Sequence, residues 1–141
     1  MAALIPDFPA DFSFTARIPV RITDINYGNH VGNDAVLSLL HEARMQFLGQ
    51  FDFTELNCGG VGLIMKDVAI EFKKEIHYGQ VLLIDVQTGP LSRVSFELYY
   101  RIRSEGTDTV SVQARTGMVC FDYSAKKIMG IPEAVRKAFG S

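Results

Sequence analysis

The chain has 141 residues, a formal net charge of −2, 48% hydrophobic residues and 21% charged residues. This length and composition are typical of a globular protein with a core of its own, so we treat residues 1–141 as a single domain. The slight excess of acidic groups argues against a nucleic-acid-binding surface, which needs a basic footprint. No apolar run reaches the length of a membrane span, so we expect no membrane partner.

The two cysteines, Cys58 and Cys120, form neither a metal-binding nor a disulfide pattern. We expect both to be reduced and partly buried, as in a cytoplasmic protein. The first residues lack the basic segment and the long apolar run of a signal peptide, which agrees with a cytoplasmic location.

The expected elements follow the order strand, helix, four strands, helix. An irregular arm occupies about residues 1–11, and a loosely alternating strand follows over residues 12–23, with Pro19 indicating an edge or a bulge. Four strands in a meander are expected over residues 61–76, 80–88, 93–104 and 109–123, separated by glycine-containing turns. Proline then opens a short last helix over about residues 132–139.

The most polar stretch, DINYGNHVGND at residues 24–34, lies between the first strand and the long helix. Its asparagines and glycines suit a turn because they tolerate unusual backbone angles and bond locally. Asn33 is expected to cap a helix over residues 34–48, with Asp34 in the first turn and Gly49 after the last. The unpaired N–H groups of such a helix start favour negative charge, so they are suited to an anionic transition state.

The expected helix is apolar over much of its circumference, which predicts that a curling sheet covers it on more than one side. One helix followed by several strands indicates an α+β fold with the sheet packed on the helix. The edges of such a sheet remain open, and edge pairing in a symmetric dimer would close them.

The pattern D-x-N-x-x-x-H-V-x-N at residues 24–33, followed by Glu-Ala-Arg at residues 42–44, resembles the hotdog-fold acyl-CoA thioesterases of the 4-hydroxybenzoyl-CoA thioesterase type. Residues 72–80 are also similar to the strand-to-turn segment of that family, and the resemblance spans roughly residues 14–123. It implies a long central helix wrapped by an antiparallel sheet of about five strands. It further implies a homodimer with active sites at the interface and coenzyme A along the nearby surface. Association into a homotetramer stays open, as does the choice between coenzyme A and an acyl carrier protein.

The chain departs from the family pattern at the position of the usual catalytic carboxylate, which is Asn26. An amide cannot ionise, so Asn26 cannot be a general base or a carboxylate nucleophile. The glycine that precedes the family's histidine is Asn29, and the first asparagine after the valine is Gly32. The loop pattern of the family is therefore present without its usual carboxylate, so the identity of the general base is open.

Thioester hydrolysis needs a polarised carbonyl, an activated water and a groove for the acyl group. Backbone N–H groups near Gly32 and Asn33 are the candidate oxyanion site. His30 is the candidate proton acceptor because histidine changes charge near neutral pH, and Asn26 is a candidate to orient the water. Each of these residues also has an ordinary structural role in a polar turn. Glu42 is a candidate for the missing base, or else a partner for a neighbouring cation.

Asp24 is expected to brace the loop by accepting backbone N–H bonds. The resemblance implies that Arg93 lies where the family meets the phosphates of coenzyme A. Lys73 and Lys74 are further candidates for this contact, although exposed cations are usually only solvated. Candidates for an acyl pocket, which could equally belong to the core, are Phe51, Phe53, Leu56 and Met65.

The resemblance, together with these residues, predicts hydrolysis of an acyl-CoA thioester to a free acid and coenzyme A, with no metal and no cofactor. One alternative is a binding module that holds the thioester without cleaving it, since the usual carboxylate is Asn26. A hotdog dehydratase is a further alternative, but it needs a histidine–carboxylate pair that the loop does not clearly supply.

Overall fold

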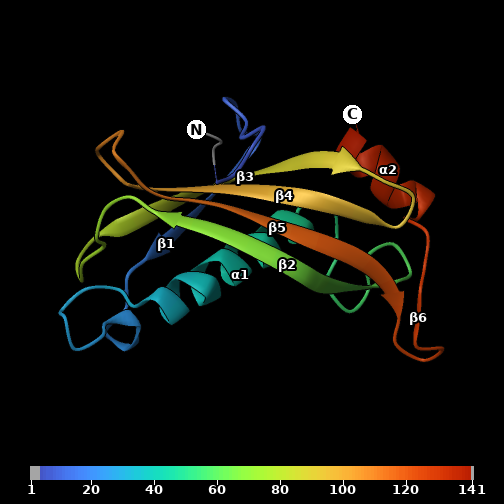
Figure 1. Cartoon of the computed structure of the whole chain (residues 1–141), viewed down its shortest axis with the longest axis horizontal. Coiled ribbons are helices and arrows are strands. Elements are labelled where there is room, and N and C mark those ends of the chain that lie inside the picture. Colours follow the sequence, from blue (N-terminus) through green and yellow to red (C-terminus); the bar gives the residue numbers. More distant parts are fainter. Residues whose placement is uncertain (1–3, 141) are drawn as a thin grey trace.

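The computed structural model describes residues 4–140 as one curved sheet with a helix along it (Figure 1). The strands are β1 (Phe14–Pro19), β2 (Gly62–Phe72), β3 (Val81–Leu91), β4 (Ser95–Ser104), β5 (Val110–Asp122) and β6 (Lys127–Ile128). The helices are α1 (Asn33–Gly49), α2 (Glu133–Gly140) and the short 3-10 helix η1 (Ile22–Asp24). Residues 4–13 are irregular, as expected for the arm, whose first three residues lie outside the described residues.

The sheet is antiparallel in the order β1-β3-β4-β5-β2, and the short β6 pairs with β5. An α+β fold with about five main strands is therefore confirmed. The predicted meander is wrong at β2, which pairs with β5 instead of β3. The chain leaves β2 at one edge and crosses three strand spacings, about 14 Å, to reach β3 near the other edge. Residues 73–80 make this crossing, and the site described below depends on it.

The first strand is shorter than predicted, because the chain turns after Pro19 and forms η1 instead of extending to residue 23. The helix α1 starts one residue earlier than predicted, and its N-cap is Gly32, which makes no side-chain cap. The prediction that Asn33 caps the helix is wrong: the Gly32 carbonyl accepts the first helical bond, from Val36 N at 3.1 Å, so Asn33 is the first helical residue.

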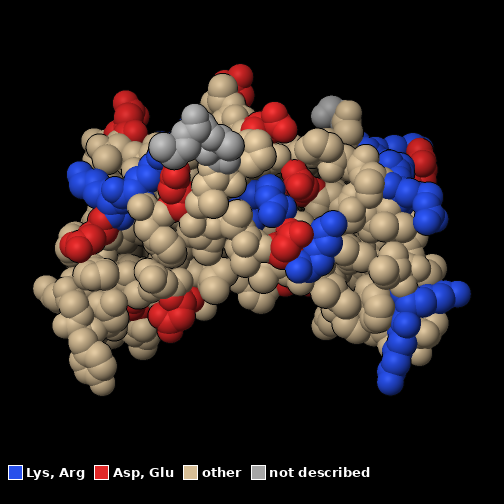
Figure 2. Space-filling view, viewed as in Figure 1, with Lys and Arg blue, Asp and Glu red and all other residues tan. Residues whose placement is uncertain are grey.

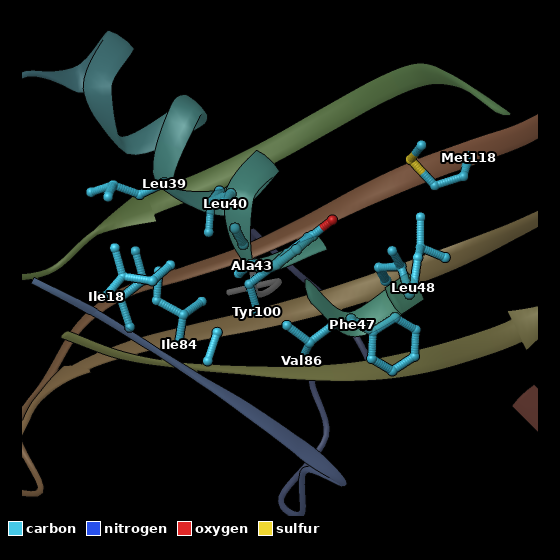
Figure 3. Close-up of a cluster of buried hydrophobic side chains, with 14 of the residues drawn as sticks. Ile18, Leu39, Leu40, Ala43, Phe47, Leu48, Ile84, Val86, Tyr100 and Met118 are labelled. Carbon is cyan, nitrogen blue, oxygen red and sulfur yellow. The ribbon is translucent and has the colours of Figure 1, made fainter. Parts of the chain in front are cut away.

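The apolar side of α1 packs on the inner face of the sheet (Figure 3). Each large apolar side chain that is fully buried there contributes about 1.5–3 kcal/mol. At the far end of α1, five rings pack together and hold α2 against the sheet: Phe47, Phe51, Phe53, Phe96 and Phe139. Phe51 and Phe53, considered for an acyl pocket, are thus part of this core cluster, while Leu56 is exposed.

A polar network is buried beneath α1. Arg44 donates through Nε to Glu55, at 3.0 Å, and through Nη1 to the hydroxyl of Tyr100, at 3.1 Å. The Tyr100 hydroxyl is also 2.7 Å from the hydroxyl of Thr116, and Glu55 bonds His41 at the surface. Burial raises the pKa of the Tyr100 hydroxyl, so it stays a neutral hydrogen-bonding group.

The outer face of the sheet carries the N-terminal arm, which Figure 1 shows on the side opposite α1. Phe8 packs edge-on against Tyr99, and the Arg101 guanidinium lies 4.5 Å from the ring centre of Phe12. Asp85 is buried on this face and accepts bonds from Thr15, Arg101 and Arg103. Burial opposes ionisation of Asp85, but the bonds from Arg103, Thr15 and Arg101 outweigh it and lower the pKa of this carboxyl.

Both cysteines are free thiols, and they are more deeply buried than expected. Burial raises the pKa of Cys58 to about 12 and that of Cys120 to about 11. No helix within residues 4–140 is long and apolar enough to cross a membrane. Figure 2 shows acidic and basic side chains interspersed on the pictured face, with basic groups gathered near α2 and β6. That face therefore carries no continuous basic surface.

Candidate active site

The polar loop is closed by backbone bonds and by the side chain of Asn26. Asn26 N donates to the carbonyl of His30 at 2.9 Å, and Asn29 takes a left-handed conformation with φ 63°. The Asn26 Oδ1 atom accepts from Gly28 N at 2.9 Å and from His30 N at 3.5 Å. These donors fix the amide orientation and occupy its oxygen. The Nδ2 donors remain, so Asn26 can hold a water or a carbonyl by donating to it.

Asp24 is buried at the entry to the loop. Its carboxylate accepts from Arg21 N at 2.8 Å and pairs with the Arg21 guanidinium. Its carbonyl oxygen accepts from Gly32 N at 3.2 Å. Asp24 therefore ties the two ends of the loop together, and its side chain is not turned to the cavity described next.

The start of α1 presents unpaired N–H groups, but not all of those expected. The Gly32 N–H is engaged by Asp24, so its predicted place in an oxyanion site is wrong for the chain as it folds here. The next three N–H groups, those of residues 33–35, have no acceptor within residues 4–140. Beside them lies a cavity of about 210 Å³, and its lining includes His30, Asn33 and Val36.

The ring of His30 is held in one orientation. Its Nδ1 atom lies 3.2 Å from the carbonyl of Val31, so Nδ1–H donates and Nε2 of the neutral ring is left as an acceptor. The ring also lies over Gly28, where an added Cβ would stand 3.0 Å from Nε2. A glycine at this position therefore leaves the space that the histidine occupies.

Two titratable residues that sequence reasoning missed, Glu75 and His77, lie near His30. Glu75 lines the cavity, and His77 lines a neighbouring groove beside Glu75. Glu75 Oε1 is 4.0 Å from Nε2 of His30, and Glu75 Oε2 is 3.6 Å from Nε2 of His77. The Nδ1 atom of His77 lies 3.3 Å from the carbonyl of Asn29, so the polar loop holds both imidazoles. Glu75 also lines the cavity with His30.

The crossing between β2 and β3 is what brings Glu75 to the loop. Val31 N donates to the carbonyl of Ile76 at 2.7 Å, which joins the loop to the middle of the crossing. Figure 1 shows the two segments at the same end of the molecule. A strand meander would place Glu75 in a tight turn away from the loop. The sequence does contain a carboxylate two residues before a histidine, in Glu75-Ile76-His77. Without knowledge of the crossing, this pair cannot be assigned to the polar loop.

The other predicted site residues divide between this cavity and other places. Lys73 and Lys74 line the cavity, and Lys73 also pairs with Glu71 at 2.9 Å. Glu42 lines a different groove, between α1 and β1, and accepts a bond from Gln46 at 2.8 Å.

Arg93 lies in the turn between β3 and β4, at the opposite end of the sheet from the cavity (Figure 1). Ile102, which pairs with the cavity residue Val112, is about 30 Å away along the strand. Within one chain the structure does not bring Arg93 or Glu42 to His30. Met65 lines a separate cavity of about 210 Å³ above Arg44 and Thr116.

No group of three His, Cys, Asp or Glu side chains in the described part of the chain could hold a metal ion. The candidate site brings His30 and Glu75 together beside the start of α1. It combines an imidazole acceptor, a carboxylate and unpaired N–H donors around one small cavity, which is the set that acyl transfer to water requires.

Comparison with known proteins gives a consistent result. The model of the thioesterase-like superfamily matches residues 20–139. A candidate esterase of Synechocystis sp. is 28% identical over 120 residues, which cover 84% of this chain and 71% of that protein.

Solved structures share the fold. The 1,4-dihydroxy-2-naphthoyl-CoA thioesterase Slr0204 of Synechocystis superimposes with a TM-score of 0.83 at 23% identity, covering 91% of this chain and 96% of that one. A thioesterase of Thermus thermophilus, complexed with coenzyme A and Zn, gives a TM-score of 0.80 at 21% identity, covering 93% and 94%.

Proposed function

Because the chain belongs to the thioesterase-like superfamily, we propose that it hydrolyses an acyl-CoA thioester to a free acid and coenzyme A. The observation that carries this proposal is the cavity of about 210 Å³ at the start of α1. Unpaired backbone N–H groups and the acceptor nitrogen of His30 meet there. This combination can bind a carbonyl oxygen and a water at the same time.

In the proposed reaction the thioester carbonyl oxygen accepts bonds from the free N–H groups of Asn33 and its neighbours. The positive end of the α1 dipole favours the negative charge that develops on that oxygen. His30 Nε2 and the Asn26 amide hold the attacking water, one by accepting and the other by donating. The addition then collapses with cleavage of the C–S bond, which releases the acid and the thiol.

Lys73 and Lys74 at the rim of the cavity suit the phosphates of a coenzyme A carrier. A related structure complexed with coenzyme A supports this choice over a carrier protein. We place the activity in the cytoplasm, because both cysteines are free thiols.

We also propose a homodimer, because β2 is an open edge that exposes apolar side chains, Met65, Val68 and Phe72 among them. Such a dimer would place each cavity beside the partner, and it leaves room for further association into a homotetramer.

The test is a thiol-release assay with aryl and alkyl acyl-CoA substrates, each paired with the same acyl group on pantetheine. Hydrolysis of both carriers is expected, with a lower KM for coenzyme A. Lys73→Ala and Lys74→Ala should raise KM for acyl-CoA only, because pantetheine lacks the nucleotide phosphates. His30→Ala should lower kcat by roughly 10²-fold. Absence of thiol release from every substrate would refute the proposal.

A second candidate function is a binding module, favoured by the fact that Asn26 cannot ionise and that its oxygen is occupied by the loop. Isothermal titration with the same acyl-CoA panel distinguishes the two functions. Binding of intact thioester without release of thiol would support the module.

A further inference from the structure

We propose that Glu75 is the general base of this site and replaces the carboxylate that the loop lacks at Asn26. The inference rests on the proposed thioester hydrolysis and adds the group that takes the proton from water. Glu75 comes from the crossing between β2 and β3, not from the polar loop.

The first argument is that the imidazole rings of His30 and His77 lie on either side of the Glu75 carboxylate without bonding to it directly. His30 and His77 each direct Nδ1 to a backbone carbonyl of the same loop, at 3.2 and 3.3 Å. Each therefore turns its Nε2 atom toward Glu75, at 4.0 and 3.6 Å. Neither distance is a direct hydrogen bond, so the carboxylate keeps its acceptor capacity for another donor.

The second argument is the spacing between the acceptors of His30 and Glu75. His30 Nε2 and Glu75 Oε1 are 4.0 Å apart. If one water lies about 2.8 Å from each of these atoms, the angle between them at the water oxygen is about 90°, close to the angle between the two O–H bonds of water. One water can thus donate to both groups and present its lone pairs to the cavity. The unpaired N–H groups of α1, which would hold the carbonyl, lie at this same cavity.

The third argument is that the other nearby carboxylates are not available. Asp24 is buried and paired with Arg21, and Glu42 lines another groove. Asp34 lies in the first turn of α1 with Oδ1 folded back to Gly32, and it is absent from the described cavity lining. Of the described residues that do line the cavity, Glu75 alone carries a carboxylate.

The resulting step is balanced. Water oxygen bonds to the thioester carbon while one water proton moves to Glu75 and the carbonyl electron pair moves to oxygen. The tetrahedral oxyanion collapses, the C–S bond breaks, and the proton on Glu75 passes to the leaving sulfur.

The experiment measures kcat and KM for wild-type protein, Glu75→Gln and Glu75→Ala on the best substrate of the thiol-release panel. Glu75→Gln keeps the size of the side chain but cannot accept a proton, so kcat should fall by about 10²- to 10⁴-fold with little change in KM. Glu133→Gln is the matched control, because Glu133 is an exposed glutamate on α2, outside the site. It should keep the wild-type rate.

Chemical rescue separates a base from a structural residue. The Glu75 side chain is 64% exposed, so its removal leaves room that formate can enter. Added formate should restore a substantial part of the lost kcat of Glu75→Ala, in proportion to its concentration, and leave Glu75→Gln unchanged. Thermal melting of all variants should match the wild type, since the side chain is exposed.

Three outcomes would overturn the inference. If Glu75→Gln keeps the wild-type kcat, Glu75 is not the general base, and the proposed hydrolase function is unaffected. Loss of activity in Glu75→Ala without rescue by formate would show that Glu75 acts by supporting the loop. An inactive wild-type protein would remove the proposed function and this inference together.

Discussion

Replacement of Asp85 by asparagine tests whether the outer face of the sheet is held together by one carboxylate. The side chain of Asp85 is 2% exposed. It accepts four bonds: from Thr15 at 2.6 Å, from Arg101 at 2.9 Å, and from Nε and Nη2 of Arg103 at 2.9 and 3.1 Å. The asparagine side chain of the Asp85→Asn variant would keep the shape but remove the charge and turn a donor toward an arginine.

The expected loss follows from these contacts. Breaking a buried ion pair on one side costs about 3–5 kcal/mol, because a charge is left without its partner. Arg101 and Arg103 keep 28% and 25% of their side-chain surface exposed, so water replaces part of what they lose. We therefore expect Asp85→Asn to lower the free energy of unfolding by about 2–3 kcal/mol at pH 7. For a chain of 141 residues this lowers Tm by about 7–10 °C.

The loss should depend on pH in a defined direction. The pKa of Asp85 is lower in the folded chain than the value of about 3.9 for an unfolded aspartate. The stabilisation by its charge is therefore fully present above about pH 5, and it is lost as pH falls through the folded pKa. The difference between wild-type protein and Asp85→Asn should thus shrink as the medium is acidified.

Urea unfolding at several pH values between 7 and 3 measures this difference directly. Glu105→Gln is the matched control, since Glu105 pairs with Arg17 at the exposed surface, where solvent screens the pair. Equal unfolding midpoints for Asp85→Asn and Glu105→Gln would refute the reasoning. A loss that stays constant down to pH 3 would show that the charge is not its source.

Further predictions concern the loop, the core and the sheet edge. Gly28→Ala should push the His30 ring aside, because the new Cβ would stand 3.0 Å from Nε2, and thiol-release assays should show kcat lowered roughly tenfold at unchanged Tm. Gly49→Ala meets no atom within 4 Å, so it should keep kcat and raise the unfolding free energy by about 0.5 kcal/mol. Tyr100→Phe leaves the buried Arg44 Nη1 donor and the Thr116 hydroxyl without their partner, and urea titration should show a loss of about 1–3 kcal/mol. Val68→Glu sets like charges across a paired β2 edge, so sedimentation should show monomers where the wild type forms dimers; a monomeric wild type would contradict the proposed dimer.

The sequence predicts those features of the fold that depend on local patterns. The helix over residues 33–49 and the alternation along β4 follow from apolar spacing, and both are found nearly where expected. Alternation does not reveal the end of the first strand, because the turn at η1 depends on the Asp24 carboxylate, which accepts a bond from Arg21 N. The N-cap lies one residue before the one that the sequence favours, because glycine can take the extended cap conformation without a side-chain bond.

Only part of the candidate site is visible in the sequence, because its two halves are far apart along the chain. His30 and the helix start come from one segment, and their pattern is visible within ten residues of sequence. Glu75 and His77 reach them only because β2 takes the outer edge and the chain must cross back. Strand order is a property of the whole sheet, and periodicity within each strand carries no information about it.

The burial of both cysteines has a practical consequence for measuring this enzyme. A thiol reagent reacts with thiolate, and the raised pKa values of Cys58 and Cys120 leave almost none at neutral pH. Neither sulfur is accessible at the surface of the folded chain. A colorimetric thiol reagent should therefore report thiol released from a thioester substrate with no background from folded protein. The same reagent would register unfolding as a slow appearance of two equivalents of thiol per chain.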